Sequence, residues 1–252
     1  MTSERVTWLG HATVLLELAG ARLLTDPLLR PRVVHLRRLV PAAEDPGHVD
    51  AVLISHLHHD HLDVPSLRRV DPGAPVLVPA GGTGPLRRLR RELREVRPGD
   101  CVRIGDARVE VVPAVHDGRR APFGPPVEPV GFLMEGRRSV YFAGDTALFE
   151  EMASLAGRVD VALLPIWGWG RDLGPGHMDP DDAARALTLL RPRIAVPIHW
   201  GTFLPVGAER RHGHLLTTPA REFADRAARV APEVRVEVLP PGGSLSLDSD
   251  SG

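Results

Sequence analysis

Short apolar runs separated by turn residues occupy most of the first half of the chain, a pattern typical of β-strands. The first three runs cover residues 6–9, 13–18 and 22–25, and Ala19-Gly20 supplies the turn between the second and the third. Further runs predict strands over residues 51–55, 75–79, 101–104, 107–114, 130–135 and 139–143. The N-terminal half is therefore expected to consist mainly of strands joined by turns.

The second half adds segments in which apolar residues recur at helical spacing. These segments predict helices over residues 147–155, 180–190 and 219–230. Near-continuous apolar runs at residues 159–165 and 194–198 predict central strands that are buried on both faces, and residues 234–239 are expected to close the sheet. Strands followed by helices in both halves predict an α/β fold in which two sheets pack together with helices outside.

Two further segments of the first half also show helical character. One covers residues 64–70, and in the other Leu86, Leu89, Leu93 and Val96 recur at helical spacing. The Arg residues of the second segment could form a nucleic-acid patch or a solvated helix face, and Glu92 and Glu95 among them favour the solvated face.

The composition adds limits on domain number, partners and compartment. The 252 residues carry a net charge of −1, so no global field would draw nucleic acid or an anionic membrane. We find no linker composition, so one domain is expected over residues 1–245, followed by a polar, frayed tail at 246–252. The single cysteine, Cys101, and the lack of a signal peptide or membrane-spanning run favour the cytoplasm.

The densest chemistry lies directly after the apolar run at residues 51–54, where four imidazoles and a carboxylate occur within six residues, His56-Leu57-His58-His59-Asp60-His61. Imidazole and carboxylate are preferred ligands of zinc and its neighbours. Residues two apart on an extended segment face the same side, so His56 and His58 can bind one ion together. Asp60 and His61 follow where the backbone turns and can reach a second ion. A solvated His-rich loop is the alternative, and the motif spacing disfavours it.

Three more potential ligands follow other predicted strands. His116 comes after the strand at 107–114, Asp145 follows Gly144 after the strand at 139–143, and His199 follows the strand at 194–198. Each residue alone could be a cap or a turn residue. Their joint occurrence with the His-rich cluster instead favours a site for two metal ions.

This order of motifs resembles the metallo-β-lactamase fold superfamily over nearly the whole chain: His-x-His-x-Asp-His, a lone His, Gly-Asp-Thr and a late His. The resemblance implies a four-layer αββα sandwich with the metals at one edge of the paired sheets. It also implies that the first metal is held by His56, His58 and His116, the second by Asp60, His61 and His199, and that Asp145 bridges them. Asp26 would orient the ligand loop without touching the metals, and His59 has no implied ligand role.

Finer motifs are similar to one branch of that superfamily, which contains ascorbate-6-phosphate lactonase-like hydrolases and the phospholipase D that cleaves N-acyl-phosphatidylethanolamine. They are Gly-His-Ala-Thr-Val-Leu-Leu-Glu at residues 10–17, Leu-Thr-Asp-Pro at 24–27, Gly-His-Met-Asp-Pro at 176–180 and Pro-Ile-His-Trp-Gly-Thr-Phe at 197–203. The chain lacks the Cys ligand of some β-lactamases and the membrane-binding elements of the phospholipase.

The resemblance implies two divalent metal ions, with zinc favoured and manganese or iron as alternatives. Between them a bridging hydroxide would attack an ester, lactone or phosphodiester bond of a small molecule. Asp60 or Asp145 could orient this nucleophile, and His177 is the candidate proton donor to the leaving group. A structural role for His177 before the helix that starts at Pro180 remains the alternative.

The remaining candidates concern the substrate pocket and other activities. His11, Trp167, Trp169 and Phe203 could line an apolar pocket or cover the core. A mononuclear iron dioxygenase that acts on a thiol or persulfide, and a nuclease, are the competing functions, and the complete two-metal ligand set favours the hydrolase. The expected partner is a small molecule, with no nucleic acid and no membrane, and the sequence makes no prediction of oligomeric state.

Overall fold

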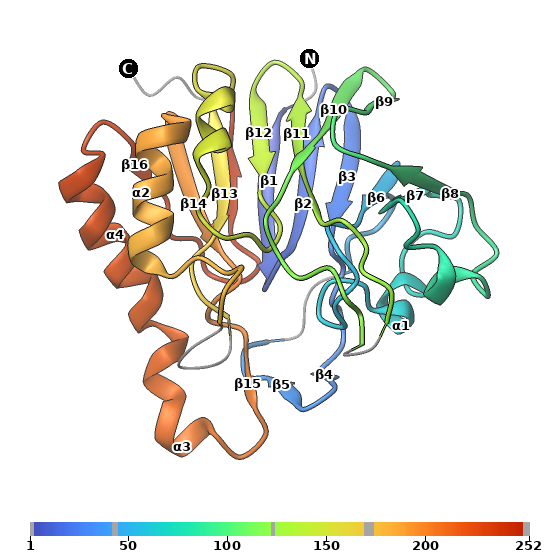
Figure 1. The fold of residues 1–252 in the computed structure, drawn as a ribbon, viewed down its shortest axis with the longest axis horizontal. Helices are drawn as coiled ribbons and strands as arrows, with labels where there is room; N and C mark the ends of the chain where they lie inside the picture. The colour runs from blue at the N-terminus through green and yellow to red at the C-terminus, as the bar shows by residue number, and fades with distance from the viewer. Residues whose placement is uncertain (1–2, 42–44, 122–123, 169–173, 249–252) are drawn as a thin grey trace.

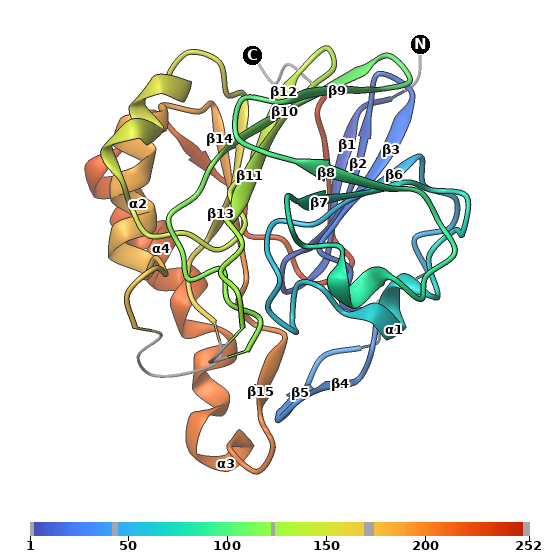
Figure 2. The ribbon, with the colours of Figure 1, turned by 45° about the vertical axis from the view of Figure 1, so that its right-hand side comes forward.

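The computed structural model describes residues 3–41, 45–121, 124–168 and 174–248. Two seven-stranded sheets face each other, with α2 and α4 against the outer side of one and α1 at the outer side of the other (Figures 1 and 2). The helices are α1 (Val64–Leu67), α2 (Pro180–Leu190), α3 (Glu209–His212) and α4 (Thr218–Val230), with 3₁₀ turns at Gly84–Leu86, Glu150–Leu155 and Gly213–Leu216. The predicted αββα sandwich is confirmed.

The first sheet has the order β17-β1-β2-β3-β6-β7-β8. Its strands are β1 (Arg5–Gly10), β2 (Thr13–Leu18), β3 (Ala21–Thr25), β6 (Ala51–Leu53), β7 (Val76–Pro79), β8 (Leu93–Val96) and β17 (Ser244–Ser246). The pairs from β17 to β3 are antiparallel, and those from β3 to β8 are parallel.

The second sheet repeats this plan in the order β16-β14-β13-β12-β11-β10-β9. Its strands are β9 (Cys101–Ile104), β10 (Ala107–Pro113), β11 (Val130–Glu135), β12 (Ser139–Phe142), β13 (Val161–Pro165), β14 (Ile194–Ile198) and β16 (Arg235–Val236). β9 to β12 pair antiparallel, and β12, β13, β14 and β16 pair parallel. A small third sheet contains β15 (Phe203–Pro205), β5 (Leu36–Arg38) and β4 (Arg32–Val33).

The period of two along the strands of the first sheet divides its side chains between two hydrophobic clusters. Leu16, Leu23 and Leu53 join the large cluster between the sheets, whereas Leu15 and Leu24 join a second cluster on the outer face beside α1. Both faces of this sheet are therefore dry, which explains why its strands are apolar at nearly every position.

The predicted helix over residues 86–96 is wrong. Leu93–Val96 form β8, which pairs parallel with β7 from Val76↔Leu93 to Pro79↔Val96. This pairing supplies the hydrogen bonds of the extended backbone, and tertiary contact thereby overrides the helical spacing. Leu86, Leu89 and Leu93 still pack in or against the outer cluster. Helical structure is also shorter than predicted near residues 64–70 and 147–155, where one helical turn and a 3₁₀ turn form.

Residues 246–248 were predicted to begin a frayed tail, but strand pairing and hydrogen bonds hold them in place. Ser246 ends β17 and lies opposite Arg5 of β1, and Leu247 is buried. The Leu247 N–H donates to the Glu4 carbonyl, while the Asp248 carboxylate accepts from the Glu4 N–H. A free tail therefore does not begin at Ser246. The strand predicted over residues 234–239 is limited to Arg235–Val236.

The Glu4 carboxylate links turns from both sheets. It is 1% exposed and accepts hydrogen bonds from the backbone N–H groups of Ala19, Arg137 and Arg138 at 2.8–3.0 Å. Ala19 lies between β2 and β3, and the two arginines lie between β11 and β12. One buried side chain thus fastens the two sheets at the strand ends opposite His11.

We predict that Glu4→Ala lowers the free energy of unfolding by about 1–3 kcal/mol, because three backbone N–H groups from the turns of both sheets lose the buried acceptor that they share. Chemical denaturation followed by circular dichroism measures the effect. Glu233→Ala, at an exposed turn residue, is the matched control and should stay within about 0.5 kcal/mol of the parent. Equal stability of the two variants would contradict the proposed link.

Candidate metal centre

The His-rich loop after β6 is anchored by the buried carboxylate of Asp26 at the end of β3. Ser55 donates to it twice, from its N–H to Oδ1 at 2.8 Å and from Oγ to Oδ2 at 2.5 Å. The Nδ1 atom of His61 donates to the same Oδ2 at 2.7 Å. Asp26 therefore holds both ends of the loop that contains the predicted ligands, as the resemblance implied.

Arg120, from the segment after His116, holds the same loop from the other side. Its Nη1 donates to the carbonyls of Leu57 at 2.5 Å and Leu62 at 3.1 Å, and its Nη2 donates to His59 Nδ1 at 3.1 Å. His59 thus pairs with Arg120 and is turned away from the centre. This contact could not be predicted from the sequence, because nothing in the loop spacing indicates which distant cation lies near its carbonyls.

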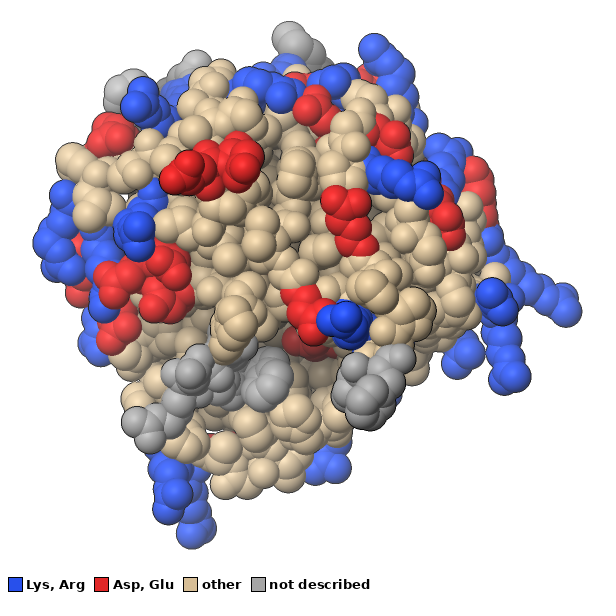
Figure 3. Space-filling view, viewed as in Figure 1, with Lys and Arg blue, Asp and Glu red and all other residues tan. Residues whose placement is uncertain are grey.

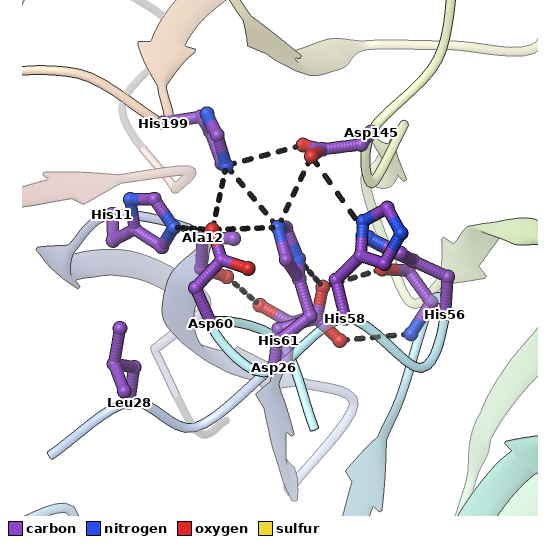
Figure 4. Close-up of polar contacts among 12 residues, drawn as sticks. His11, Ala12, Asp26, Leu28, His56, His58, Asp60, His61, Asp145 and His199 are labelled. Carbon is purple, nitrogen blue, oxygen red and sulfur yellow. Dashed lines mark hydrogen bonds and ion pairs between the residues drawn. The ribbon is translucent and has the colours of Figure 1, made fainter. Parts of the chain in front are cut away.

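The structure brings the seven predicted ligands together, from both sheets, at one edge of the sandwich. Figure 4 shows His56, His58, Asp60, His61, Asp145 and His199. Asp145 lies between the two groups: its Oδ2 is 3.2 Å from His61 Nε2 and 3.9 Å from His56 Nε2, and its Oδ1 is 3.3 Å from His199 Nε2. The donor atoms of His56, His58 and His116 all lie within 4.8 Å of one another, as do those of His11, Asp60, His61 and His199.

Backbone strain contributes to this convergence. His11, Asp26 and His199 have positive φ values of 55°, 34° and 61°. Each follows or ends a strand, and the left-handed conformation turns the chain sharply so that the side chain enters the site. Such residues cost about 1–3 kcal/mol each and persist where the surrounding structure holds them. Here the His199 N–H donates to the His11 carbonyl, which ties two of these turns together.

Hydrogen bonds at Nδ1 fix the orientation of four imidazoles. His199 Nδ1 donates to the Trp167 carbonyl at 2.6 Å, and His116 Nδ1 donates to the Gly176 carbonyl at 2.8 Å. His61 Nδ1 donates to Asp26, and His56 Nδ1 donates to Ser55 Oγ, whose own proton goes to Asp26. In all four rings the neutral form therefore presents an Nε2 lone pair, the arrangement found in metal-binding histidines.

The contacts among these atoms fit bound cations. The Nε2 atoms of His61 and His199 face each other at 3.1 Å, and two lone pairs at that distance repel. In the part of the chain that the structure describes, His56 Nε2 and Asp145 Oδ1 are buried without a hydrogen-bond partner. Buried polar atoms without partners are costly, and divalent metal ions at the centre would satisfy them.

The electrostatics of the centre favour bound positive charge. Burial lowers the pKa of His116 to about 4 and the pKa of His56 well below its ordinary value, so both rings are neutral. Burial alone would raise the pKa of Asp145, but His199 and His61 lower it well below its usual range. Against the opposing effect of burial, Asp145 and Asp60 raise the pKa of His61, so the centre attracts positive charge.

Two candidate histidines outside the ligand set, His11 and His177, lie in different parts of the site. His11 is buried behind Asp60, and its Nε2 lies 3.0 Å from Asp60 Oδ2, so it orients this carboxylate and does not line a pocket. The side chain of His177 is 22% exposed at the opening of the site, with Nε2 3.6 Å from Asp145 Oδ2. The cap of α2 is Asp179, which leaves His177 free of the capping role.

Of the aromatic residues considered for a substrate pocket, Trp167 borders the metal centre. Trp167 borders the centre through its carbonyl bond to His199, and its side chain is buried. Phe203 is 1% exposed and packs with Leu28, Val33 and Leu36 around the small third sheet, which favours the alternative that it covers the core. Trp169 lies outside the described residues.

Comparison with known proteins identifies the family. A family model described as the beta-lactamase superfamily domain matches residues 21–200. This chain belongs to that superfamily. A UPF0173 metal-dependent hydrolase of Opitutus terrae is 36% identical over 256 residues, covering 96% of this chain and 100% of the relative. Another from Methanopyrus kandleri is 33% identical over 259 residues, covering 95% and 98%. The chain is thus a member of the UPF0173 metal-dependent hydrolases.

Solved structures show the same beta-lactamase superfamily fold. Igni18, a metallo hydrolase from Ignicoccus hospitalis, aligns with a TM-score of 0.72 at 23% identity, and the alignment covers 98% of this chain and 100% of the Igni18 chain.

Among the described residues, no helix has the length and apolar character needed to cross a membrane. On the face shown in Figure 3, basic and acidic side chains are interspersed around the outline.

We predict that Ser55→Ala lowers the metal affinity of this superfamily member by about 10–100-fold, because His56 loses the group that orients its ring. Competition with a chromophoric chelator measures the affinity, and circular dichroism checks the fold. Ser154→Ala, at an exposed position near the end of the 3₁₀ turn Glu150–Leu155, is the matched control. An unchanged affinity in Ser55→Ala would show that His56 is oriented by other contacts.

Proposed function

We propose that this chain is a binuclear metal-dependent hydrolase that cleaves an ester, lactone or phosphodiester bond of a small molecule. The observation that supports this proposal most strongly is that two groups of potential metal ligands meet at one buried carboxylate, Asp145. Its Oδ1 faces His199 of one group, and its Oδ2 lies between His61 of that group and His56 of the other, a position that suits a bridging ligand. Zinc is the favoured metal for this nitrogen-rich set, with manganese or iron as alternatives.

When bound, a pair of divalent ions supplies an activated water nucleophile at neutral pH and positive charge for the transition state. The protein supplies the geometry. His11 holds Asp60 through the 3.0 Å contact at Oδ2, so that this carboxylate can orient the nucleophile. Asp26, Ser55 and Arg120 hold the loop that presents the ligands. These contacts all lie on the side of the ligand loop, so the side of the centre near His177 is left for the leaving group.

His177 is the proposed proton donor. Its ring lies 4.5 Å from that of His116, its Nε2 is 3.6 Å from Asp145, and its partial exposure lets a substrate approach. Burial lowers the pKa of His177, so its ring is mainly neutral at pH 7 and would first take a proton from the attacking water. That proton, passed on from Nε2, would then neutralise the oxygen that departs as the bond breaks. The His177 side chain is therefore assigned to catalysis and not to metal retention.

The first test is metal dependence. Purified protein should contain close to two metal ions per chain, lose hydrolysis on chelation and regain it on reloading. Asp60→Ala and His199→Ala should each lower kcat/KM by more than about 100-fold, because ligands and their orienting partners act together. A panel of p-nitrophenyl acetate, a γ-lactone and bis(p-nitrophenyl) phosphate reports the bond class.

Asp117→Ala is the control for these variants, since Asp117 is an exposed carboxylate next to His116 in sequence. It should keep both metal content and activity. Full hydrolysis by metal-free protein would contradict the proposal, as would one iron per chain with oxygen consumption on a thiol substrate.

A second test separates the role of His177 from that of the ligands. We predict that His177→Gln lowers kcat by about 10²–10⁴-fold, the range expected for loss of a general acid. Its metal content, measured by elemental analysis, should equal that of the parent. A large loss of metal in His177→Gln would instead make His177 a ligand.

A further inference from the structure

A pocket of about 490 Å³ lies directly beside the metal centre. One wall is the hairpin β4–β5, with Val33, Val34 and Leu36, and the other is the ligand loop, with His58 and Asp60. Sites for small molecules typically measure about 300–1,000 Å³. Because two predicted metal ligands belong to its lining, a group held in this hairpin pocket would lie next to the bond that is cleaved.

Three of the four hairpin residues that line the pocket are apolar, the fourth is His35, and the wall is firmly supported. Val33 and Leu36 are buried in the small cluster that also contains Leu28 and Phe203, so this part of the wall is fixed in place. Val34 is 74% exposed, more than any other large hydrophobic residue of the described chain. A valine this exposed beside a metal centre offers apolar surface that a ligand could cover.

The backbone at Val34 gives a second, independent indication. Val33 pairs with Leu36, so Val34 and His35 form a two-residue turn, and Val34 has a φ of 47°. Turns of this kind favour Gly, Asn or Asp at positions with positive φ, and a β-branched residue there is an outlier. Strained residues of this sort cluster at ligand-binding sites. The strain at Val34 therefore suggests a function for its side chain.

The one permanent cation of the lining, Arg120, does not point to an anionic ligand. Three of its five N–H groups donate to Leu57, Leu62 and His59. This guanidinium is mainly occupied in holding the ligand loop. The hairpin pocket is therefore suited to an uncharged group, since a charged one would lose its hydration against the valine and leucine side chains.

We propose that the hairpin pocket binds an apolar group of the substrate, a short alkyl chain or an aromatic ring attached to the ester or lactone that is hydrolysed. This inference rests on the hydrolytic function proposed above and names the substrate class of that site. Val34 determines specificity in this arrangement, because it forms the exposed rim over which the apolar group must pass.

The binding test does not require turnover. Straight-chain carboxylates from acetate to octanoate, titrated by calorimetry into the metal-loaded protein, share one headgroup and differ only in apolar length. Affinity should rise about fourfold for each methylene until the pocket is filled, which corresponds to ~0.8 kcal/mol per buried CH₂. The heat capacity change should become more negative along the series. Affinity that is independent of chain length would overturn the inference.

Val34→Asn tests the residue itself. Asn is polar, close in size to Val and tolerant of positive φ, so this variant removes the apolar rim and relieves the turn. We expect a smaller gain in affinity per methylene together with a melting temperature that is equal or higher by roughly 2–4 °C. Val238→Asn, at an exposed valine of the C-terminal segment, is the matched control and should keep the parent's dependence on chain length. Equal dependence in Val34→Asn and the parent would contradict the role of Val34.

Turnover of p-nitrophenyl esters from acetate to octanoate separates this inference from the proposed function. Hydrolysis of all esters with equal kcat/KM would support the hydrolase and overturn the apolar pocket. Chain-length-dependent binding of carboxylates without hydrolysis of any ester would support the pocket and count against ester cleavage. A rise in kcat/KM with chain length that is reduced in Val34→Asn supports both.

Discussion

The buried carboxylate of Asp26 is the contact on which the centre depends. A charge in a dry environment must be compensated, and here Ser55 and His61 supply three hydrogen bonds to its two oxygens. Those bonds join the end of β3 to the start and the end of the ligand loop. The shape of the loop is therefore set in part by a residue on a neighbouring strand.

The two sheets add a second constraint. Parallel strands of each sheet end at the same edge, so Asp26 and His56 from the first sheet meet Asp145 and His199 from the second (Figure 4). At the opposite ends of the strands, Glu4 ties the turns of the two sheets together. The distances between the ligands therefore depend on how the two sheets pack, because the core between the sheets holds them in position.

The sequence predicted the candidate metal ligands more completely than the groups that orient them, and the cause is the kind of atom that each role requires. Metal ligands need specific side chains at strand ends, so His56, His58 and Asp145 leave a visible pattern. The bonds that orient them leave little pattern, because Gly176 and Trp167 contribute main-chain carbonyls that every residue has. The metal-ligand roles themselves await the tests described above.

Errors of prediction arose where tertiary contacts decide between local alternatives. Residues 86–96 have helical spacing, yet the free edge of β7 draws Leu93–Val96 into a strand. For Phe203 the sequence left a pocket and core packing open, and its contacts with the hairpin β4–β5 favour the core. The hairpin pocket went unpredicted because residues 33–36 carry no chemical motif, and only the turn conformation of Val34 makes them conspicuous.

The use of main-chain carbonyls as anchors has a consequence for sequence divergence. His199 is oriented by the backbone carbonyl of Trp167, so this hydrogen bond does not depend on which side chain position 167 carries. Position 176 is more restricted, because its φ of 93° and the 3.2 Å between an added Cβ and His116 Nδ1 favour glycine. The direction of the His199 ring can therefore survive a change at position 167 that still fills the core there, whereas position 176 should vary little.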